Sequence, residues 1–133
     1  MKWIFIYFFS TLLLAATSVH ASQDIEKKLS SVKLFSLGFN GFVAKKMPQQ
    51  LIYEEALKDN NSNLIFKKIL HNPTSTPESK AYAACGLWKN NQLKELTLNE
   101  TFLNKEVTVL KGDILRKENL GEIFNGIKSH GCN

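Results

Sequence analysis

Apolar positions recur every three or four residues along much of this chain, which is the spacing of one face of an α-helix. Ile25, Leu29 and Val32 form one such series. The series are interrupted at prolines, glycines and asparagines, so the pattern divides into separate helices of ordinary length. The helices predicted in this way cover residues 23–34, 48–58, 63–71 with Ser62 as N-cap, 77–89 and 120–127, with a short one over 92–98.

Two of these helices carry clear start signals. Thr76 is a suitable N-cap and is followed by Pro77, a residue favoured at the first helical position. Asn119 is a second suitable N-cap, with Glu122 three residues on, as in a capping box. The helix behind Thr76 is rich in small residues over 81–86, which lets other helices approach closely. We therefore expect it to be the central element of the fold.

One segment has the chemistry of a strand. Residues 107–110 are mostly β-branched and lie between Lys105 and Gly112, and Phe39–Ala44 is the expected strand partner. The surrounding segment, residues 34–46, contains glycines and phenylalanines that predict an extended or looping stretch with its aromatic rings buried in the core. Together these patterns predict a mainly α fold: a small single-domain helical bundle with at most a short two-stranded β element, stapled by one disulfide.

The first 21 residues have the order of a secretory signal peptide. Lys2 precedes an apolar run over residues 3–16, and Val19 and Ala21 suit the −3 and −1 positions of a cleavage site. Cleavage after Ala21 leaves one helix-rich exported domain, residues 22–133. The alternative is a retained anchor, but the run is shorter than the roughly 20 residues that span a bilayer. We expect no transmembrane segment after cleavage, and a periplasmic or secreted location.

The charge pattern argues against nucleic acid as a partner. The chain has 17 basic and 12 acidic residues and a net charge of +5. Its lysines are scattered in pairs, and Arg116 is its only arginine. Nucleic-acid-binding domains usually gather Lys and Arg on one face. The lysine pairs are therefore interpreted as solvated helix faces.

The two cysteines, Cys85 and Cys132, favour a disulfide in an exported protein. This bond would attach the C-terminal tail to the predicted central helix. Two alternatives stay open at this stage. The cysteines could be unpaired or joined between molecules, or Cys132 could bind a metal together with His130, although no further ligand completes a tetrahedral set.

No arrangement of residues predicts catalysis. His71 and His130 have no second ligand at helical spacing, and no recognised nucleophile or phosphate-binding motif is present. Cys85 with a distant histidine could form a nucleophile pair, but its alanine neighbours favour a buried structural role. Glu54 and Glu55 point in different directions on a helix. We therefore assign no catalytic, cofactor-binding or metal-binding residue, and an enzyme is the less favoured interpretation.

The stretch from Pro77 to Leu87 ends in the sequence Ala-Tyr-Ala-Ala-Cys-Gly-Leu (residues 81–87) and resembles the "AYALCGL"-like helix of a family of small exported bacterial proteins. Some members of that family are found beside microcin gene clusters. The run over 107–112, followed by Ile123 and Ile127, is also similar in order and spacing. The resemblance implies an exported helical domain and supplies no catalytic residues.

These observations favour a non-enzymatic periplasmic or secreted protein that acts by contact with another envelope or secreted protein. An accessory or immunity role in bacterial competition is the most specific form of this hypothesis. The alternatives are a small ligand-binding module or enzyme that uses Phe35–Phe42 as a pocket wall, and a protein whose mild positive charge attracts anionic surfaces.

Overall fold

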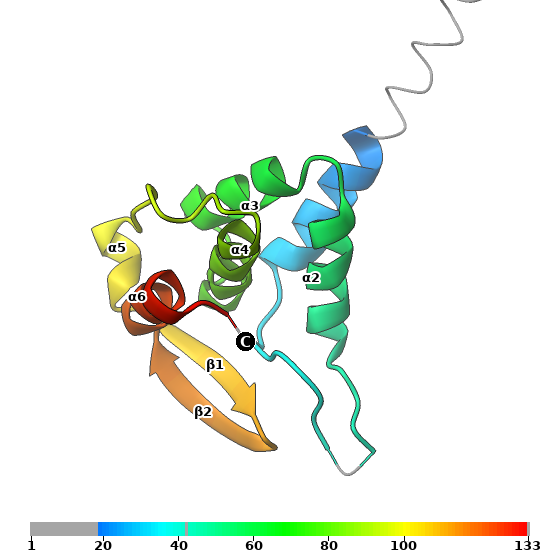
Figure 1. The fold of residues 1–133 in the computed structure, drawn as a ribbon, viewed down its shortest axis with the longest axis vertical. Helices are drawn as coiled ribbons and strands as arrows, with labels where there is room; N and C mark the ends of the chain where they lie inside the picture. The colour runs from blue at the N-terminus through cyan, green and yellow to red at the C-terminus, as the bar shows by residue number, and fades with distance from the viewer. Residues whose placement is uncertain (1–18, 42, 133) are drawn as a thin grey trace, which may run out of the picture.

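The computed structural model describes residues 19–41 and 43–132. The predicted leader falls outside them except for residues 19–21, which belong to a first helix described over residues 19–30. The later elements are α2 (Pro48–Lys58), α3 (Ser62–His71), α4 (Pro77–Lys89), α5 (Glu100–Leu103), β1 (Glu106–Lys111), β2 (Ile114–Asn119) and α6 (Leu120–His130) (Figure 1). The predicted class, mainly α with a short two-stranded sheet, is confirmed.

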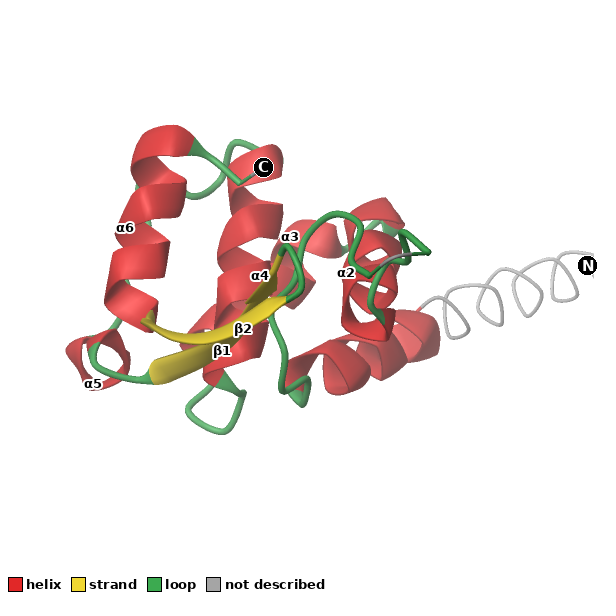
Figure 2. Ribbon diagram, turned by 90° about the horizontal axis from the view of Figure 1, so that it is seen from below, coloured by secondary structure: helices red, strands yellow, loops and turns green. Residues whose placement is uncertain are grey.

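Helix α4 lies at the centre of the fold, as predicted. It runs between α6 and the sheet on one side and α2 on the other (Figures 1 and 2), and every residue from Glu78 to Leu87 is buried. Small side chains make this possible. A Cβ added at Gly86 would lie 2.3 Å from the ring of Phe66 on α3, so only glycine permits the observed packing there.

The predicted start signals act as expected. The hydroxyl of Thr76 accepts a hydrogen bond from the Ser79 amide at 3.1 Å, and the Asn119 side chain accepts one from the Glu122 amide at 3.2 Å. Each bond satisfies one of the amides that a helix start leaves unpaired. At α3 the prediction was wrong by one residue, because Asn61 occupies the N-cap position and Ser62 is helical.

The strand partner differs from the prediction. β1 pairs antiparallel with β2, and the two-residue turn Gly112-Asp113 joins them. Both turn residues have positive φ, as a type I′ hairpin requires. A neighbouring strand needs only this short turn, so it has a smaller closure cost than the distant segment Phe39–Ala44. In this part of the chain, Asn40 instead forms an isolated β-bridge with Lys45, the residue after the segment. Phe42 lies outside the described residues.

Two further predictions were wrong. Residues 92–98 form turns and coil rather than a helix, and the short helix begins only at Glu100, behind an Asn99 side chain that accepts from the Thr101 amide. Leu93 and Leu98 are nevertheless buried, so this segment is held by packing. The aromatic segment does not bury all its rings. Phe39 is 67% exposed.

The predicted disulfide between Cys85 and Cys132 is present, with the two Cα atoms 5.5 Å apart. The bond attaches Cys132, which follows α6 and Gly131, to the middle of α4. Disulfides are typical of oxidising compartments. Among the described helices, none is long and apolar enough to cross a membrane.

Removal of the disulfide should destabilise the fold substantially. The bond joins residues 47 positions apart, and closing a loop of this size in the unfolded chain corresponds to about 4 kcal/mol. We expect the Cys85→Ala/Cys132→Ala variant to lose most of that free energy of unfolding in urea titrations. Wild-type protein under reducing conditions is the matched control. Equal midpoints for oxidised protein and variant would contradict the expectation.

Candidate functional site

The residues considered for chemistry in the sequence do not converge. His71 and His130 are both exposed, at the ends of α3 and α6. Cys85 and Cys132 are bonded to each other, which removes the thiolate that a nucleophile or metal ligand requires. Within residues 19–41 and 43–132, no three His, Cys, Asp or Glu side chains are grouped closely enough to hold a metal ion.

Lys80 is a buried charge that sequence reasoning missed. It is 1% exposed, and its ammonium group donates to four oxygen atoms at 2.6–3.0 Å: the main-chain oxygens of Ile69, Leu70 and Asn72 and the hydroxyl of Ser75. Its nitrogen also lies 4.1 Å from the centre of the Phe102 ring. These contacts satisfy main-chain carbonyl groups at the C-terminal end of α3, where the helix dipole favours a cation. We therefore assign Lys80 a structural role.

A cleft of about 280 Å³ lies between the sheet, α6 and the segment before residue 38. Its lining includes Phe35, Ser36, Val109, Lys111, Glu118 and Ile127. The peptide groups of Ser36 are already bonded to the Tyr82 hydroxyl, and its own hydroxyl accepts from Asn40. The cleft is at the lower limit of volume for small-molecule sites, and its most buried polar residue is already partnered.

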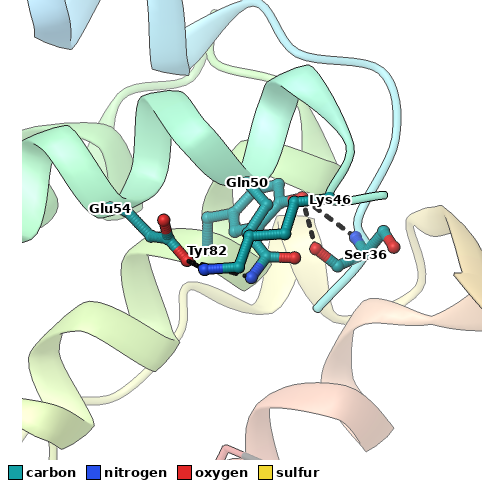
Figure 3. Close-up of polar contacts among 5 residues, drawn as sticks. All are labelled: Ser36, Lys46, Gln50, Glu54 and Tyr82. Carbon is teal, nitrogen blue, oxygen red and sulfur yellow. Dashed lines mark hydrogen bonds and ion pairs between the residues drawn. The ribbon is translucent and has the colours of Figure 1, made fainter. Parts of the chain in front are cut away.

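The segment that carries the predicted pocket wall is fixed at both ends (Figure 3). Near its start, the Tyr82 hydroxyl accepts from the Ser36 amide and donates to the Ser36 carbonyl, both at 2.9 Å. Near its end, Lys46 donates to Glu54 at 2.8 Å, and Gln50 donates to the same oxygen. The hydrogen bond from Lys46 lowers the pKa of Glu54. The loop between these anchors therefore projects from a fixed base.

That loop lies beside the hairpin turn. Both are at the same end of the molecule (Figure 1), and the Gly41 amide donates a hydrogen bond to the Asp113 carboxylate. Positive φ angles at Gly38, Gly41, Gly112 and Asp113 define the two tight turns. The contact joins residues 72 positions apart in the chain.

Large apolar side chains are exposed on both turns. The loop carries Phe39 and Val43, 67% and 73% exposed, and the hairpin carries Ile114 and Leu115, 62% and 64% exposed. We call these four residues the tip surface. Of the seven large apolar residues exposed in the described part of the chain, these four lie on the two joined turns. Exposed apolar residues concentrated on two adjoining turns, unlike residues scattered singly, are typical of contact sites.

Sequence reasoning located the loop that carries Phe39 but did not find this surface. Phe39 was expected in the core, and the strand that carries Ile114 and Leu115 was not predicted. One signal was available: Gly112-Asp113 follows a β-branched run, which is typical of a hairpin turn. A hairpin there would have placed the two apolar residues next to an exposed turn.

Comparisons of this chain with protein-family profiles, with curated proteins and with solved structures found no match. The function is therefore inferred from the chain's own residues.

The protonation of Lys80 should make the free energy of unfolding depend on pH. Burial lowers its pKa from the usual 10.5 to about 8. Between these values the folded lysine is neutral while the unfolded one still holds its proton, so the free energy of unfolding should rise with pH. Above about pH 10 it should fall, because burial raises the pKa of Tyr82 from 10.0 to about 12 and the unfolded tyrosine then loses its proton first.

The measurement is urea unfolding at pH values from 7 to 11, compared with the Lys80→Met variant. We expect the rise above pH 8 in the wild type and its absence in the variant, with the fall above pH 10 in both. A rise of equal size in both proteins would show that another group is responsible.

The contact between the two turns can be tested at Asp113. Asp113→Gly keeps the positive φ and removes the carboxylate, whereas Asp113→Asn keeps an acceptor oxygen. We expect the Gly41 amide to exchange with solvent about fivefold faster in the glycine variant, equivalent to a typical hydrogen bond of ~1 kcal/mol. Protection in the asparagine variant should stay near wild type. Unchanged exchange in both variants would exclude the contact.

Proposed function

We propose that this protein is a non-enzymatic exported protein, periplasmic or secreted, that acts by binding another envelope or secreted protein. The tip surface is the binding site in this proposal. The observation that carries it is the exposure of four large apolar side chains on two turns that are tied together. Exposed apolar area on a fixed support loses little conformational entropy on binding.

Several features of the chain support this proposal. The leader-like first 21 residues favour export, and the disulfide suits an oxidising location. The resemblance of the α4 sequence to small exported bacterial proteins found beside microcin genes favours an accessory or immunity role in bacterial competition. In such a role the protein would bind one specific partner outside the cytoplasm.

The second candidate function is binding of a small ligand in the cleft beside β1. The observation in its favour is that Phe35 and Ser36 line this cleft, as a pocket wall in the aromatic segment would require. We rank it second because the polar groups of Ser36 are already bonded within the protein. Protein contact needs no further polar group in the site.

Site-specific photocrosslinking tests the first proposal. A photoreactive phenylalanine analogue replaces Phe39 or Leu115 in cells that export the protein. Leu51 on α2 and Leu64 on α3 are matched control positions, since they are apolar and 52% and 53% exposed. We expect one protein adduct, identified by mass spectrometry, from positions 39 and 115 and not from the controls.

Other outcomes would overturn the proposal. Adducts of equal yield at all four positions would indicate non-specific contact. Adducts with lipid alone would show that the tip surface binds a membrane. Loss of a small-molecule ligand on substitution of the cleft residue Ile127, with no protein adduct at the tip, would favour the second candidate.

A further inference from the structure

The outer edge of β2 has backbone groups available for another strand. On β1, the Thr108 oxygen accepts from the Phe35 amide and the Leu110 amide donates to the Phe35 oxygen, so these two residues point away from β2. Alternate residues of an antiparallel strand point to opposite edges. The register pairs Leu110 with Leu115 and Thr108 with Lys117. The main-chain groups of Leu115 and Lys117 therefore point outward from β2.

No described segment covers this edge. β2 pairs only with β1 among the described residues, and none of the other backbone hydrogen bonds of the described chain involves Leu115 or Lys117. By contrast, the outer edge of β1 is occupied by Phe35 and by Glu78, whose carboxylate accepts from the Thr108 amide at 3.0 Å. Open edges are the places where proteins add an extended segment of a partner.

The side chains along β2 specify which segment fits. Ile114 and Leu115 are exposed and apolar, and Arg116 and Lys117 follow them with basic groups. Arg116 forms an ion pair with Glu118 at 3.5 Å, but the pair is exposed to solvent and contributes little to stability. Residues directly opposite one another on paired strands are most stable as apolar pairs or opposite charges. A complementary strand therefore carries acidic residues opposite the basic pair and apolar residues opposite Ile114 and Leu115.

A second copy of this chain fits less well. When two β2 strands pair antiparallel through the outward groups of Leu115 and Lys117, the two registers of greatest overlap are centred on Arg116 or on Lys117. Each places a basic residue directly opposite its own copy, which is destabilising. The register centred on Lys117 also places Arg116 opposite Glu118, but it keeps the like-charge pair at its centre, which a complementary segment avoids. Basic side chains in the middle of an edge strand are a common protection against self-pairing.

We propose that β2 binds an extended segment of a partner protein by strand addition, with adjacent acidic residues opposite Arg116 and Lys117 and apolar residues opposite Ile114 and Leu115. This inference rests on the proposed function and specifies its partner, because Ile114 and Leu115 belong to the tip surface. The main-chain hydrogen bonds supply affinity, and the charge pattern selects the segment.

The test uses a synthetic peptide of sequence Thr-Lys-Glu-Glu-Val-Ile-Thr with blocked ends, and the disulfide-bonded protein observed by NMR. The control peptide, Thr-Glu-Lys-Lys-Val-Ile-Thr, has the same composition of apolar residues with reversed charges. We expect the acidic peptide to slow exchange of the Leu115 and Lys117 amides and to bind at least tenfold more tightly than the control peptide.

Three variants separate the contribution of the backbone from that of the charge. Lys117→Pro removes an outward amide that β1 does not use, so the hairpin should persist while peptide affinity falls at least tenfold. Lys117→Gln removes the same charge but keeps the amide, and should lose only about threefold, as an exposed ion pair would. Arg116→Glu/Lys117→Glu keeps every backbone group and should reverse the preference between the two peptides.

Several results would overturn strand addition: equal binding of both peptides, protection of amides elsewhere, or no peptide binding at all. Protection of Leu115 and Lys117 in free protein at high concentration would identify a second copy as the occupant. If tip-surface crosslinks to a protein persist in Lys117→Pro while the peptide fails, protein contact stands and strand addition is wrong. Absence of a protein crosslink from positions 39 and 115, with Lys117 left unchanged, would remove both proposals.

Discussion

Burial of α4 on all sides is the constraint on which the rest of this structure depends. A helix buried along ten consecutive residues must place its polar side chains against partners, since an unpaired buried polar group is costly. Three of these side chains hold another element: Glu78 holds β1, Lys80 holds the end of α3, and Tyr82 holds the segment at Ser36. Cys85 holds the C-terminal tail covalently.

This arrangement explains how exposed apolar residues keep fixed positions. The loop with Phe39 begins next to Ser36, which is bonded to α4, and the hairpin with Leu115 contains β1, which is also bonded to α4. The contact between Gly41 and Asp113 then joins two turns whose supports already have fixed positions. The tip surface is thus a consequence of the core, although none of its four residues belongs to the core.

The sequence predicted what depends on local pattern. The helices α2, α3, α4 and α6, the caps Thr76 and Asn119 and the pairing of Cys85 with Cys132 all follow from spacing, cap chemistry and residue counts. The predictions that failed depend on tertiary context. Lys80 is buried because the end of α3 needs a donor there, and Phe39 is exposed because two turns hold it outward; neither cause is visible in the local sequence.

The disulfide also divides the chain into a covalent ring and a part outside it, and this division affects what proteolysis can remove. The covalent ring from Cys85 to Cys132 encloses the hairpin, whereas the loop with Phe39 lies outside the ring. Exposed turns are where proteases cut. A single cut at Gly112 would leave two peptide chains, one with α4 and the other with α6. The disulfide would still join them covalently. A cut after Ala44 would instead separate Phe39 and Val43 covalently from the rest of the chain, so the two halves of the tip surface differ in their resistance to proteolytic loss.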